Sequence, residues 1–329
     1  MKYYRYKDEH SIVCLLCKHY CTLKEDKSGI CGINFNENGE LVNRTYAHPS
    51  AVHIDPIEKK PLYHFQPFSK SFSLGTVGCN FRCPFCQNYT ISQTTNIDTS
   101  VVYMPEDIVR LALEHKTQSI SYTYNEPTIW YPYAKDIGVL AKEQGLKNVF
   151  VSSGYESHEV LEDMKSWLDA ANIDLKSFSH DYYKKVLKTN LDGVLESLIE
   201  FAKSNIWLEI TTLLIPGVND SEEEIHQMAA FISSKLGLEI PWHFSAFHPD
   251  YKMLDTPSTP YETLLKAREI AHGYGIKYVY LGNVRTDSNT YCPKCQAKLV
   301  DRNNFTIGAL DVRSGSCEVC GESIKGVWL

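Results

Sequence analysis

Cysteine is the residue type in this sequence with the clearest capacity for chemistry. The eleven cysteines fall into three groups with none left over, and an odd number cannot all pair as disulfides. The groups hold four, three and four residues: Cys14, Cys17, Cys21 and Cys31; Cys79, Cys83 and Cys86; and Cys292, Cys295, Cys317 and Cys320. Clustered thiols outside secreted proteins usually bind metal or do redox chemistry. Two groups have enough thiolates for a closed four-coordinate site, and the middle group is one ligand short.

The middle group has the spacing of an open iron–sulfur site. Cys79, Cys83 and Cys86 follow the pattern C-x3-C-x2-C, directly after the first strand predicted for the central part of the chain. Such a loop can give one thiolate to each of three irons of a cubane, so that the fourth iron lacks a protein ligand. That position is then free for a substrate, as in catalytic zinc sites. The alternative is three unrelated buried or zinc-binding thiols.

The elements around this loop alternate between short β-rich runs and helical patterns from about residue 71 to 282. The expected strands are Ser71–Val77, Ser119–Tyr124, Asn148–Ser152, Ala171–Leu175, Trp207–Ile215, Trp242–Phe247 and Lys277–Leu281. The expected helices are Glu106–Glu114, Trp130–Gln144, His158–Leu168, Asp192–Lys203, Glu222–Lys235 and Tyr261–His272. Such alternation predicts βα units with a parallel sheet, in a full or partial (β/α) barrel. An open doubly wound sheet is the alternative.

Two of the helix starts carry capping signals. Ser221 and Glu224 predict a capping box, and Thr259 and Glu262 predict another. Pro260 is expected at the first helical position of the second of these helices.

The three-cysteine loop, with Phe85 just before its last cysteine, resembles the signature of radical S-adenosylmethionine (SAM) enzymes. The resemblance implies a [4Fe–4S] cluster whose open iron is chelated by the amino and carboxylate groups of SAM. It also implies reductive cleavage of SAM to a 5′-deoxyadenosyl radical, which abstracts hydrogen from a substrate. The cofactor would do the difficult chemistry, and the protein would position it and exclude water.

Two further strand ends resemble SAM-binding segments of that family more loosely. Asn125 and Glu126 stand where the family has a Gly-Gly-Glu motif that contacts the SAM ammonium, and only the glutamate is kept. Ser152 and Ser153 resemble the polar strand end beside the SAM ribose. The alternatives are a first-turn helix glutamate and a plain turn.

The fourth and sixth strands end in candidate charged contacts. Asp174 and Lys176 are similar to the Asp-x-Lys of activating enzymes for glycyl radical proteins, in which the lysine pairs with the SAM carboxylate. The alternative is a salt bridge at the rim. His248 follows the sixth strand, where related enzymes place a histidine near SAM, although a lone histidine is as readily structural.

A narrower resemblance covers nearly the whole chain. The N-terminal cysteine set, the stretches 58–65 and 278–283, the Tyr-Asn-Glu-Pro sequence at 124–127 and the C-terminal cysteine pairs resemble the radical SAM enzyme of the AmmeMemoRadiSam system. That family is often described as similar to pyruvate formate-lyase activating enzyme. The resemblance implies Memo-type and AMMECR-type partner proteins and a reductant of the flavodoxin or ferredoxin type.

The two flanking cysteine sets predict small metal-stapled modules. Cys292, Cys295, Cys317 and Cys320 form two CxxC knuckles, which favour a zinc ribbon over a rubredoxin-like iron, an auxiliary iron–sulfur cluster or redox-active thiols. The set from Cys14 to Cys31 also offers four thiolates, and zinc is favoured over iron there only slightly.

Together these patterns predict an α/β protein in three parts. They are an N-terminal four-cysteine module over residues 1–65, a partial (β/α)6-type radical SAM barrel over 66–285, and a zinc-ribbon-like module over 286–329. The rival functions are a glycyl radical activase and a non-catalytic scaffold in which zinc knuckles mediate contacts. A three-thiolate group makes a poor structural site, which weighs against the scaffold.

Composition and charge bear on the partners and the localisation of the protein. The net charge of −7 argues against general binding to nucleic acid or to anionic membranes. No apolar run approaches the roughly 20 residues of a membrane span, and the first residues lack the apolar segment of a secretory signal. We therefore expect a cytoplasmic protein without nucleic-acid or membrane partners.

Overall fold

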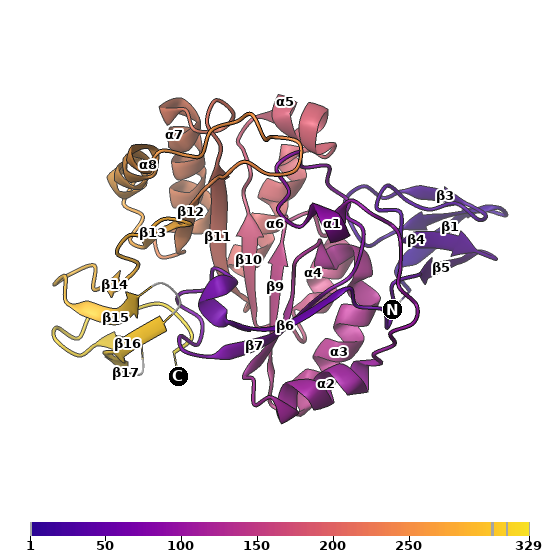
Figure 1. Ribbon diagram of the computed structural model, residues 1–329, viewed down its shortest axis with the longest axis horizontal. Coiled ribbons are helices and arrows are strands. Elements are labelled where there is room, and N and C mark those ends of the chain that lie inside the picture. Colours follow the sequence, from indigo (N-terminus) through magenta and orange to yellow (C-terminus); the bar gives the residue numbers. More distant parts are fainter. Residues whose placement is uncertain (1, 304–305, 314, 329) are drawn as a thin grey trace.

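The computed structural model describes residues 2–303, 306–313 and 315–328. A β-rich N-terminal part and a β-rich C-terminal part lie at opposite ends of an α/β body (Figure 1). The N-terminal part contains a three-stranded antiparallel sheet and a hairpin, formed by β1 (Tyr4–Asp8), β2 (Ser11–Cys14) and β3 (Thr22–Lys24), then β4 (Asn34–Glu37) and β5 (Glu40–Asn43).

An eight-stranded sheet forms the middle of the molecule, in the order β13-β12-β11-β10-β9-β8-β7-β6. Its strands are β6 (Ala51–Pro56), β7 (Lys70–Gly75), β8 (Ser119–Tyr122), β9 (Lys147–Ser152), β10 (Ala170–Asp174), β11 (Trp207–Leu214), β12 (Trp242–Ala246) and β13 (Val279–Gly282). Strands β7 to β13 run parallel and β6 is antiparallel to β7. Because β6 and β13 are the two edges of this sheet, the barrel is open, and the predicted fold class is confirmed.

The sheet contains all seven strands that the sequence predicts, in chain order. Strand β6 lies within the predicted 1–65 module, yet it pairs with β7 from Ala51–Gly75 to Pro56–Lys70 and so extends the central sheet. The module boundaries themselves stay a prediction.

Helices cover the outer face of the sheet (Figure 1). They are α2 (Pro105–Glu114), α3 (Tyr131–Glu143), α4 (His158–Met164), α6 (Leu191–Lys203), α7 (Glu222–Phe231) and α8 (Tyr261–Gly273). The short helices α1 (Tyr89–Ser92) and α5 (His180–Tyr182) lie in the loops that follow β7 and β10. Short 3-10 turns span Ile57–Lys59 and Pro127–Trp130, and π-helical turns span Tyr183–Leu187 and Ile232–Leu236. The helices and the outward strand residues form one continuous apolar core, as expected for a parallel sheet.

The inner face of the sheet carries polar side chains. The strand registers align them in rows, with Ser71 beside Ser119, Ser73 beside Ser121, Asn172 beside Glu209, Asp174 beside Thr211, and Thr211 beside His243. Residues directly across a register share one face of a sheet. The inner face therefore needs hydrogen-bond partners that an apolar core cannot provide.

Residues 57–65, which we call the plug segment, provide many of these partners. Ile57, Leu62 and Phe65 pack against Val149 and Ala170 near the beginnings of β9 and β10. The carbonyl of Pro61 accepts a hydrogen bond from Asn172 Nδ2 at 2.8 Å. The plug segment thus fills the amino-terminal half of the inner face and leaves the carboxyl-terminal half open.

Glu209 holds the plug segment in place. Its buried carboxylate accepts hydrogen bonds from the backbone N–H groups of Tyr63 (2.9 Å) and His64 (2.7 Å), and it lies 2.7 Å from His243 Nε2. Burial opposes ionisation of Glu209, but the contacts with His243 and the hydrogen bond from the Tyr63 N–H together outweigh it and lower the pKa of the carboxyl group. The plug is therefore anchored on a buried, charged group.

The C-terminal part packs against the plug segment. Its strands are β14 (Thr290–Tyr291), β15 (Lys298–Asn303), β16 (Thr306–Leu310), β17 (Val312–Arg313) and β18 (Ser316–Cys317). Tyr63 shares an apolar cluster with Leu299, Val300 and Ile324, and Arg302 Nη2 donates to the carbonyl of Tyr63 at 2.6 Å. The plug segment therefore connects the barrel to the C-terminal part.

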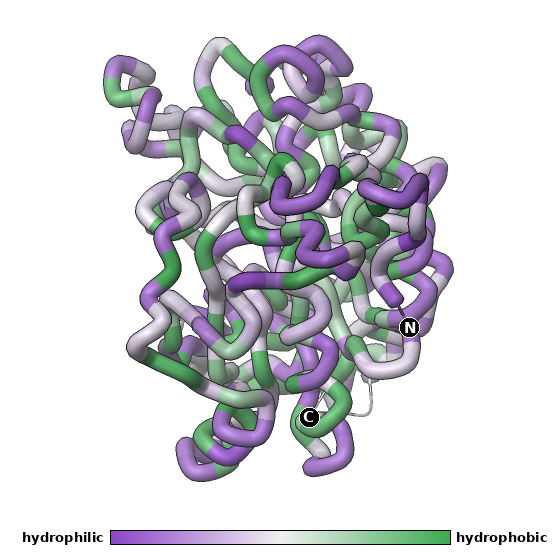
Figure 2. Tube along the Cα trace, turned by 90° about the vertical axis from the view of Figure 1, so that its right-hand side faces the viewer, coloured by the Kyte–Doolittle hydropathy of each residue, from purple (hydrophilic) through white to green (hydrophobic). Residues whose placement is uncertain are grey.

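Within the part of the chain that the structure describes, no helix combines the length and the apolar character of a membrane span. Hydrophobic and hydrophilic stretches instead alternate over short distances along the chain (Figure 2).

His64 lies where the plug, the barrel and the C-terminal part meet. Its Nδ1–H donates to the Lys325 carbonyl at 2.8 Å, and its Nε2 accepts from the Tyr280 hydroxyl at 2.7 Å. These contacts satisfy a neutral imidazole. Burial lowers the pKa of His64 to about 4, well below the usual value near 6.5.

This pKa shift makes stability depend on pH. Between about pH 6.5 and 4 the unfolded chain binds a proton at His64 and the folded chain does not, so acid favours unfolding. We expect this group alone to remove up to about 3 kcal/mol of unfolding free energy over that range. His64→Gln, which cannot titrate, should show a flatter dependence of melting temperature on pH than the wild type. Parallel curves for the two proteins would contradict the assignment.

Candidate active site

The three-cysteine loop follows β7 at the carboxyl-terminal side of the sheet. Cys79 and Cys83 are buried and Cys86 is half-buried. All three line a cavity of about 310 Å³. Barrel enzymes build their active sites at this end of the strands, because loops from neighbouring strands meet there.

Most of the residues that the sequence singles out line the same cavity. The lining includes Cys79, Cys83, Phe85, Cys86, Asn125, Glu126, Ser152, Ser153, Asp174 and Lys176. His248 is exposed and is absent from this lining, but it lies 2.7 Å from Gln87 Nε2, and Gln87 lines the cavity. The roles assigned to these residues stay predictions.

Asn125 shapes the cysteine loop. Its Nδ2 donates to the carbonyl of Gly78 at 2.9 Å and to Thr76 Oγ1 at 3.1 Å. Its Oδ1 accepts from the backbone N–H of Thr76 and from the indole N–H of Trp130, both at 3.1 Å. The amide is thus occupied in tying the start of the loop to the end of β8.

Glu126 is held by donors on one side and is open on the other. Its Oε1 accepts from Thr128 N (3.1 Å), Thr128 Oγ1 (2.7 Å) and Ser152 Oγ (2.8 Å). Among the described residues, its Oε2 accepts only from Ser153 N, at 2.8 Å. A carboxylate oxygen can accept about two hydrogen bonds. Oε2 therefore has room for one more donor, such as an ammonium group in the cavity.

A second carboxyl group supports this arrangement. Ser152 Oγ lies 2.5 Å from Glu156 Oε1, yet its single proton cannot serve both Glu126 and Glu156. Burial and the neighbouring charge of Glu126 raise the pKa of Glu156 to about 7. A proton held on Glu156 lets both carboxyl groups share Ser152 without repulsion.

Asp174 and Lys176 form an ion pair beside the cysteine loop. Lys176 Nζ lies 2.6 Å from Asp174 Oδ2, and the lysine side chain is only 12% exposed. Burial opposes the lysine charge, but the neighbouring Asp174 carboxylate favours it, and the pKa of Lys176 is raised. The cavity therefore contains a permanent cation next to a cysteine.

Burial determines the protonation of the thiols in the absence of metal. Burial raises the pKa of Cys79 well above its usual range and that of Cys83 to about 12. Without metal, both stay protonated at neutral pH, because a buried thiolate is costly. Metal replaces these protons, and three inward-facing thiols beside a cation suit an anionic thiolate-bound cluster. The residues present therefore fit the [4Fe–4S] group that the resemblance implies.

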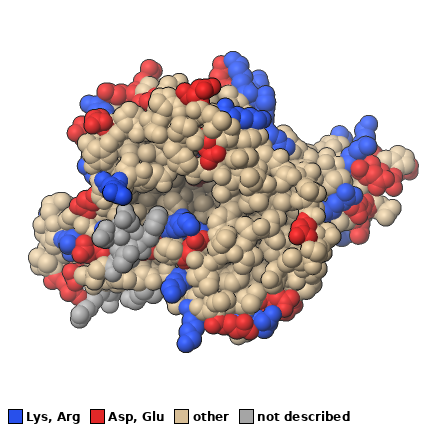
Figure 3. Space-filling model, viewed as in Figure 1, with Lys and Arg blue, Asp and Glu red and all other residues tan. Residues whose placement is uncertain are grey.

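A larger cavity of about 930 Å³ adjoins the first one. Both are lined by Gln87, Asn88, Tyr124, Ser245 and Asn283. Figure 3 shows that the surface is hollowed near the middle of the molecule, with basic and acidic side chains at its margin. Ser245 and Asn283 are cavity residues that the sequence motifs did not indicate, although their positions at the ends of β12 and β13 are a signal that could have found them.

The C-terminal cysteines form a compact set of their own. The sulfur atoms of Cys292, Cys295, Cys317 and Cys320 all lie within 4.8 Å of one another, with 3.6 Å between Cys292 and Cys320. Four sulfurs around one metal at about 2.3 Å are expected roughly 3.8 Å apart. This geometry suits a single tetrahedral ion, zinc or iron.

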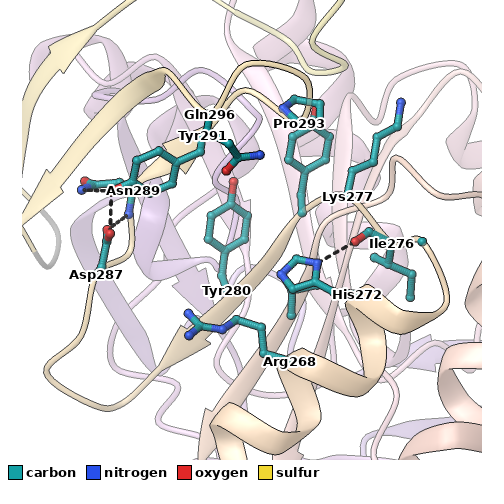
Figure 4. A pocket seen from close by; sticks show the side chains of 13 residues that line it. Arg268, His272, Ile276, Lys277, Tyr280, Asp287, Asn289, Tyr291, Pro293 and Gln296 are labelled. Carbon is teal, nitrogen blue, oxygen red and sulfur yellow. Dashed lines mark hydrogen bonds between the residues drawn. The ribbon is translucent and has the colours of Figure 1, made fainter.

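A third cavity, of about 460 Å³, lies between α8, β13 and the C-terminal part (Figure 4). Arg268 and His272 of α8 face it from one side, and Tyr291 and Gln296 from the other. None of the predicted site residues lines it. We assign it no role in the chemistry of the cysteine loop.

Comparison with known proteins agrees with a cluster-binding loop at this cavity. Residues 73–229 match the family model of the radical SAM superfamily. An uncharacterized protein of Methanocaldococcus jannaschii is 44% identical over 98% of this chain and 97% of its own length. The chain belongs to the radical SAM superfamily. The pyruvate formate-lyase-activating enzyme of Clostridium pasteurianum is 24% identical over 54% of this chain and 80% of its own length.

A solved structure has the same fold. SuiB of Streptococcus suis, in its complex with S-adenosylmethionine, aligns with a TM-score of 0.52 at 12% identity, covering 69% of this chain and 53% of SuiB. Membership of the superfamily supports an enzyme that uses SAM and a cluster, and leaves the specific reaction open.

Gly78 provides a test of how the cysteine loop is seated. Its backbone has φ +87°, and a Cβ there would lie 2.9 Å from the Cys31 carbonyl oxygen. Gly217 has a similar φ of +72° but no atom within 4 Å of such a Cβ. Both alanine variants should lose about 1–2 kcal/mol from the left-handed backbone. Only Gly78→Ala should also lose iron on anaerobic reconstitution, measured as iron per chain. Equal iron content in the two variants would contradict the close packing.

Proposed function

We propose that this protein is a radical SAM enzyme that binds a [4Fe–4S] cluster through Cys79, Cys83 and Cys86 and cleaves SAM reductively. One observation carries the proposal: the three thiols share a cavity with the strand-end groups Glu126, Asp174 and Lys176. When bound, the cluster supplies the electron that splits SAM into methionine and a 5′-deoxyadenosyl radical, which takes a hydrogen atom from a substrate.

The residues of the chain hold and orient SAM. Lys176, kept charged by Asp174, pairs with the SAM carboxylate, and Glu126 Oε2 accepts from its ammonium group. Ser152 and Ser153 line the wall beside these two contacts. Because Glu126 and Lys176 are largely buried, their interactions with SAM are screened little by water.

The larger adjoining cavity receives the substrate. Its volume of about 930 Å³ is at the upper end of the range for small-molecule sites. Lys59, Lys60 and Arg285 line it, together with Glu58 and Tyr63. Burial lowers the pKa of Lys60 to about 8, although Asp55 lies 2.6 Å away. This cavity shares its wall with the SAM cavity, so a substrate there lies next to the radical.

The first test is SAM cleavage without a substrate. Anaerobically reconstituted wild type, given dithionite and SAM, should release 5′-deoxyadenosine. Cys83→Ala should release none above background, because the loop then lacks a thiolate for its cluster. Cys295→Ala, altered in the C-terminal set, should retain most of the activity. SAM cleavage by the Cys83→Ala variant would contradict the proposal.

A second candidate function is activation of a glycyl radical protein. The observation that favours it is the similarity to the pyruvate formate-lyase-activating enzyme of Clostridium pasteurianum. In that case the hydrogen donor is a glycine of a partner protein. Memo-type and AMMECR-type proteins are proposed as partners on the AmmeMemoRadiSam resemblance, with a flavodoxin or ferredoxin as reductant.

Electron paramagnetic resonance separates the two functions. An activase should produce a glycine-centred doublet on an added partner protein, with about one 5′-deoxyadenosine per radical. An enzyme for a small substrate should give 5′-deoxyadenosine and no such doublet. Deuterium from labelled small molecules should then appear in the 5′-deoxyadenosine.

A further inference from the structure

The larger of the two adjoining cavities has an excess of basic side chains in its wall. Lys59, Lys60 and Arg285 line it, and Glu58 is the only aspartate or glutamate among the described residues that do so. The carboxyl group of Glu58 is buried, accepts from the N–H of Phe68 at 3.2 Å, and has a pKa that burial raises. The wall therefore carries more positive than negative charge at neutral pH.

One carboxylate, that of Asp55, is shared by both lysines of this wall. Its Oδ1 lies 2.9 Å from Lys59 Nζ, and its Oδ2 lies 2.6 Å from Lys60 Nζ. The Tyr124 hydroxyl also donates to Oδ2, at 2.6 Å. A single negative charge cannot neutralise two ammonium groups, so this cluster keeps a net positive charge. Arg285 adds to that charge, because it is exposed and has no ion pair within the part of the chain that the structure describes.

Lys60 is a buried cation with unused hydrogen-bond donors. Its side chain is only 2% exposed, and burial lowers its pKa to about 8, which leaves it mostly charged at neutral pH. An ammonium group has three N–H donors, and Asp55 is the one described residue that accepts from Lys60 Nζ. A buried charge with unused donors is costly, and an acceptor in the cavity would remove that cost. A negatively charged oxygen is the best acceptor, since charge-assisted hydrogen bonds are the strongest.

Tyr124 connects this cation to the SAM cavity. The centre of its ring lies 4.7 Å from Lys60 Nζ, and Tyr124 lines both cavities. Its backbone has φ +71°, a left-handed conformation that is strained for a tyrosine, and its carbonyl accepts from Asn88 Nδ2 at 2.9 Å. Asn88 lines both cavities as well. An acidic group bound to Lys60 therefore lies about one aromatic ring away from the wall that the two cavities share.

We propose that the substrate is a small organic anion, whose carboxylate or phosphate group binds Lys60. This inference rests on the proposed function, because it takes the larger cavity as the substrate site. Lys59 and Arg285 add positive charge around the bound group, and the carbon skeleton extends from Lys60 along the shared wall toward SAM. Lys60 determines specificity, since a neutral molecule of the same shape would leave its donors unpaired.

Two oxyanions and a neutral analogue test the requirement for charge. The protein is reconstituted with its cluster, saturated with SAM so that the SAM cavity is filled, and left unreduced so that no SAM is cleaved. Inorganic phosphate, malonate and malonamide are then titrated by calorimetry at constant ionic strength. At least one of the anions should bind about tenfold more tightly than malonamide, because it can use the donors of Lys60. Tighter binding of phosphate indicates a phosphorylated substrate, and tighter binding of malonate indicates a carboxylic acid.

A matched pair of lysine variants locates the bound anion. Lys60→Met has a side chain of similar length and leaves Asp55 paired with Lys59, and it should weaken anion binding about tenfold or more. Lys135→Met is the control. Lys135 Nζ lies 2.8 Å from Asp163, which also accepts from two tyrosine hydroxyls, but Lys135 is not part of the cavity wall. Its variant should bind the anion as tightly as the wild type does.

Arg285→Gln keeps the proposal testable if Lys60→Met does not fold, as judged by circular dichroism. Because Arg285 is exposed, its loss should leave the fold intact and weaken anion binding about threefold. Unchanged anion affinity in Lys60→Met, or in Arg285→Gln where Lys60→Met is unfolded, would overturn the proposal. So would malonamide binding as tightly as both anions, a result that favours an uncharged substrate such as a glycine of a partner protein. Neither result would affect the 5′-deoxyadenosine assay of the proposed function, because the titration involves no turnover.

Discussion

The hydrogen bonds to Glu209 are the constraint on which the interior of this molecule depends. An open parallel sheet has a concave face that must be filled, and here that face carries polar side chains. The plug segment fills the half near the amino-terminal ends of the strands, and there Glu209 accepts from the N–H groups of Tyr63 and His64. A buried carboxylate without partners is costly, and removing one partner of such a group costs about 3–5 kcal/mol. The half of the face near the carboxyl-terminal ends of the strands then stays open as the cavity beneath the cysteine loop.

Much of the fold follows from the pattern of the sequence. Strands β7 to β13 are buried on both faces and are separated by helices with ordinary start and stop signals, so periodicity and turn residues suffice to find them. The plug segment is different, because its partners lie over a hundred residues away on β10 and β11. No local pattern distinguishes it from the end of an N-terminal module.

The helix caps also show that local sequence patterns do not reveal tertiary contacts. Ser221 does accept from the N–H of Glu224, as the capping box requires, but the Glu224 carboxylate accepts from Ser177 and from the N–H of Phe178 instead. The second predicted box is wrong: Thr259 Oγ1 donates to the Leu214 carbonyl and accepts from Phe247, and Pro260 is the cap residue. In both places a tertiary contact takes over a side chain that the local pattern assigns to the helix.

The candidate site was predictable to the extent that topology determines it. The carboxyl ends of parallel strands meet, so Glu126, Asp174 and Lys176 were expected near the cysteine loop, and the structure gathers them there. Asn125 is instead engaged in holding the loop, and His248 stands outside the cavity lining. The contact of His19 Nε2 with the Asn80 carbonyl oxygen could not be predicted, because it forms only when residues 14–31 fold against residues 78–82. The spacing of cysteines predicts sets of ligands, but not which sets are neighbours.

The hydrogen bonds of Arg82 link two segments that are translated at different times. Arg82 joins the Ile30 carbonyl to the catalytic loop, and Gly78 packs on Cys31. Residues 14–31 leave the ribosome well before residues 78–86, so the surface that shapes the loop is synthesised before the loop itself. His64 and Arg302 link the plug to the C-terminal part, so the lower closure of the barrel waits for the last segment to be translated. The segment that packs on the catalytic loop is therefore translated before the loop, and the part of the chain that closes the barrel from below is translated last.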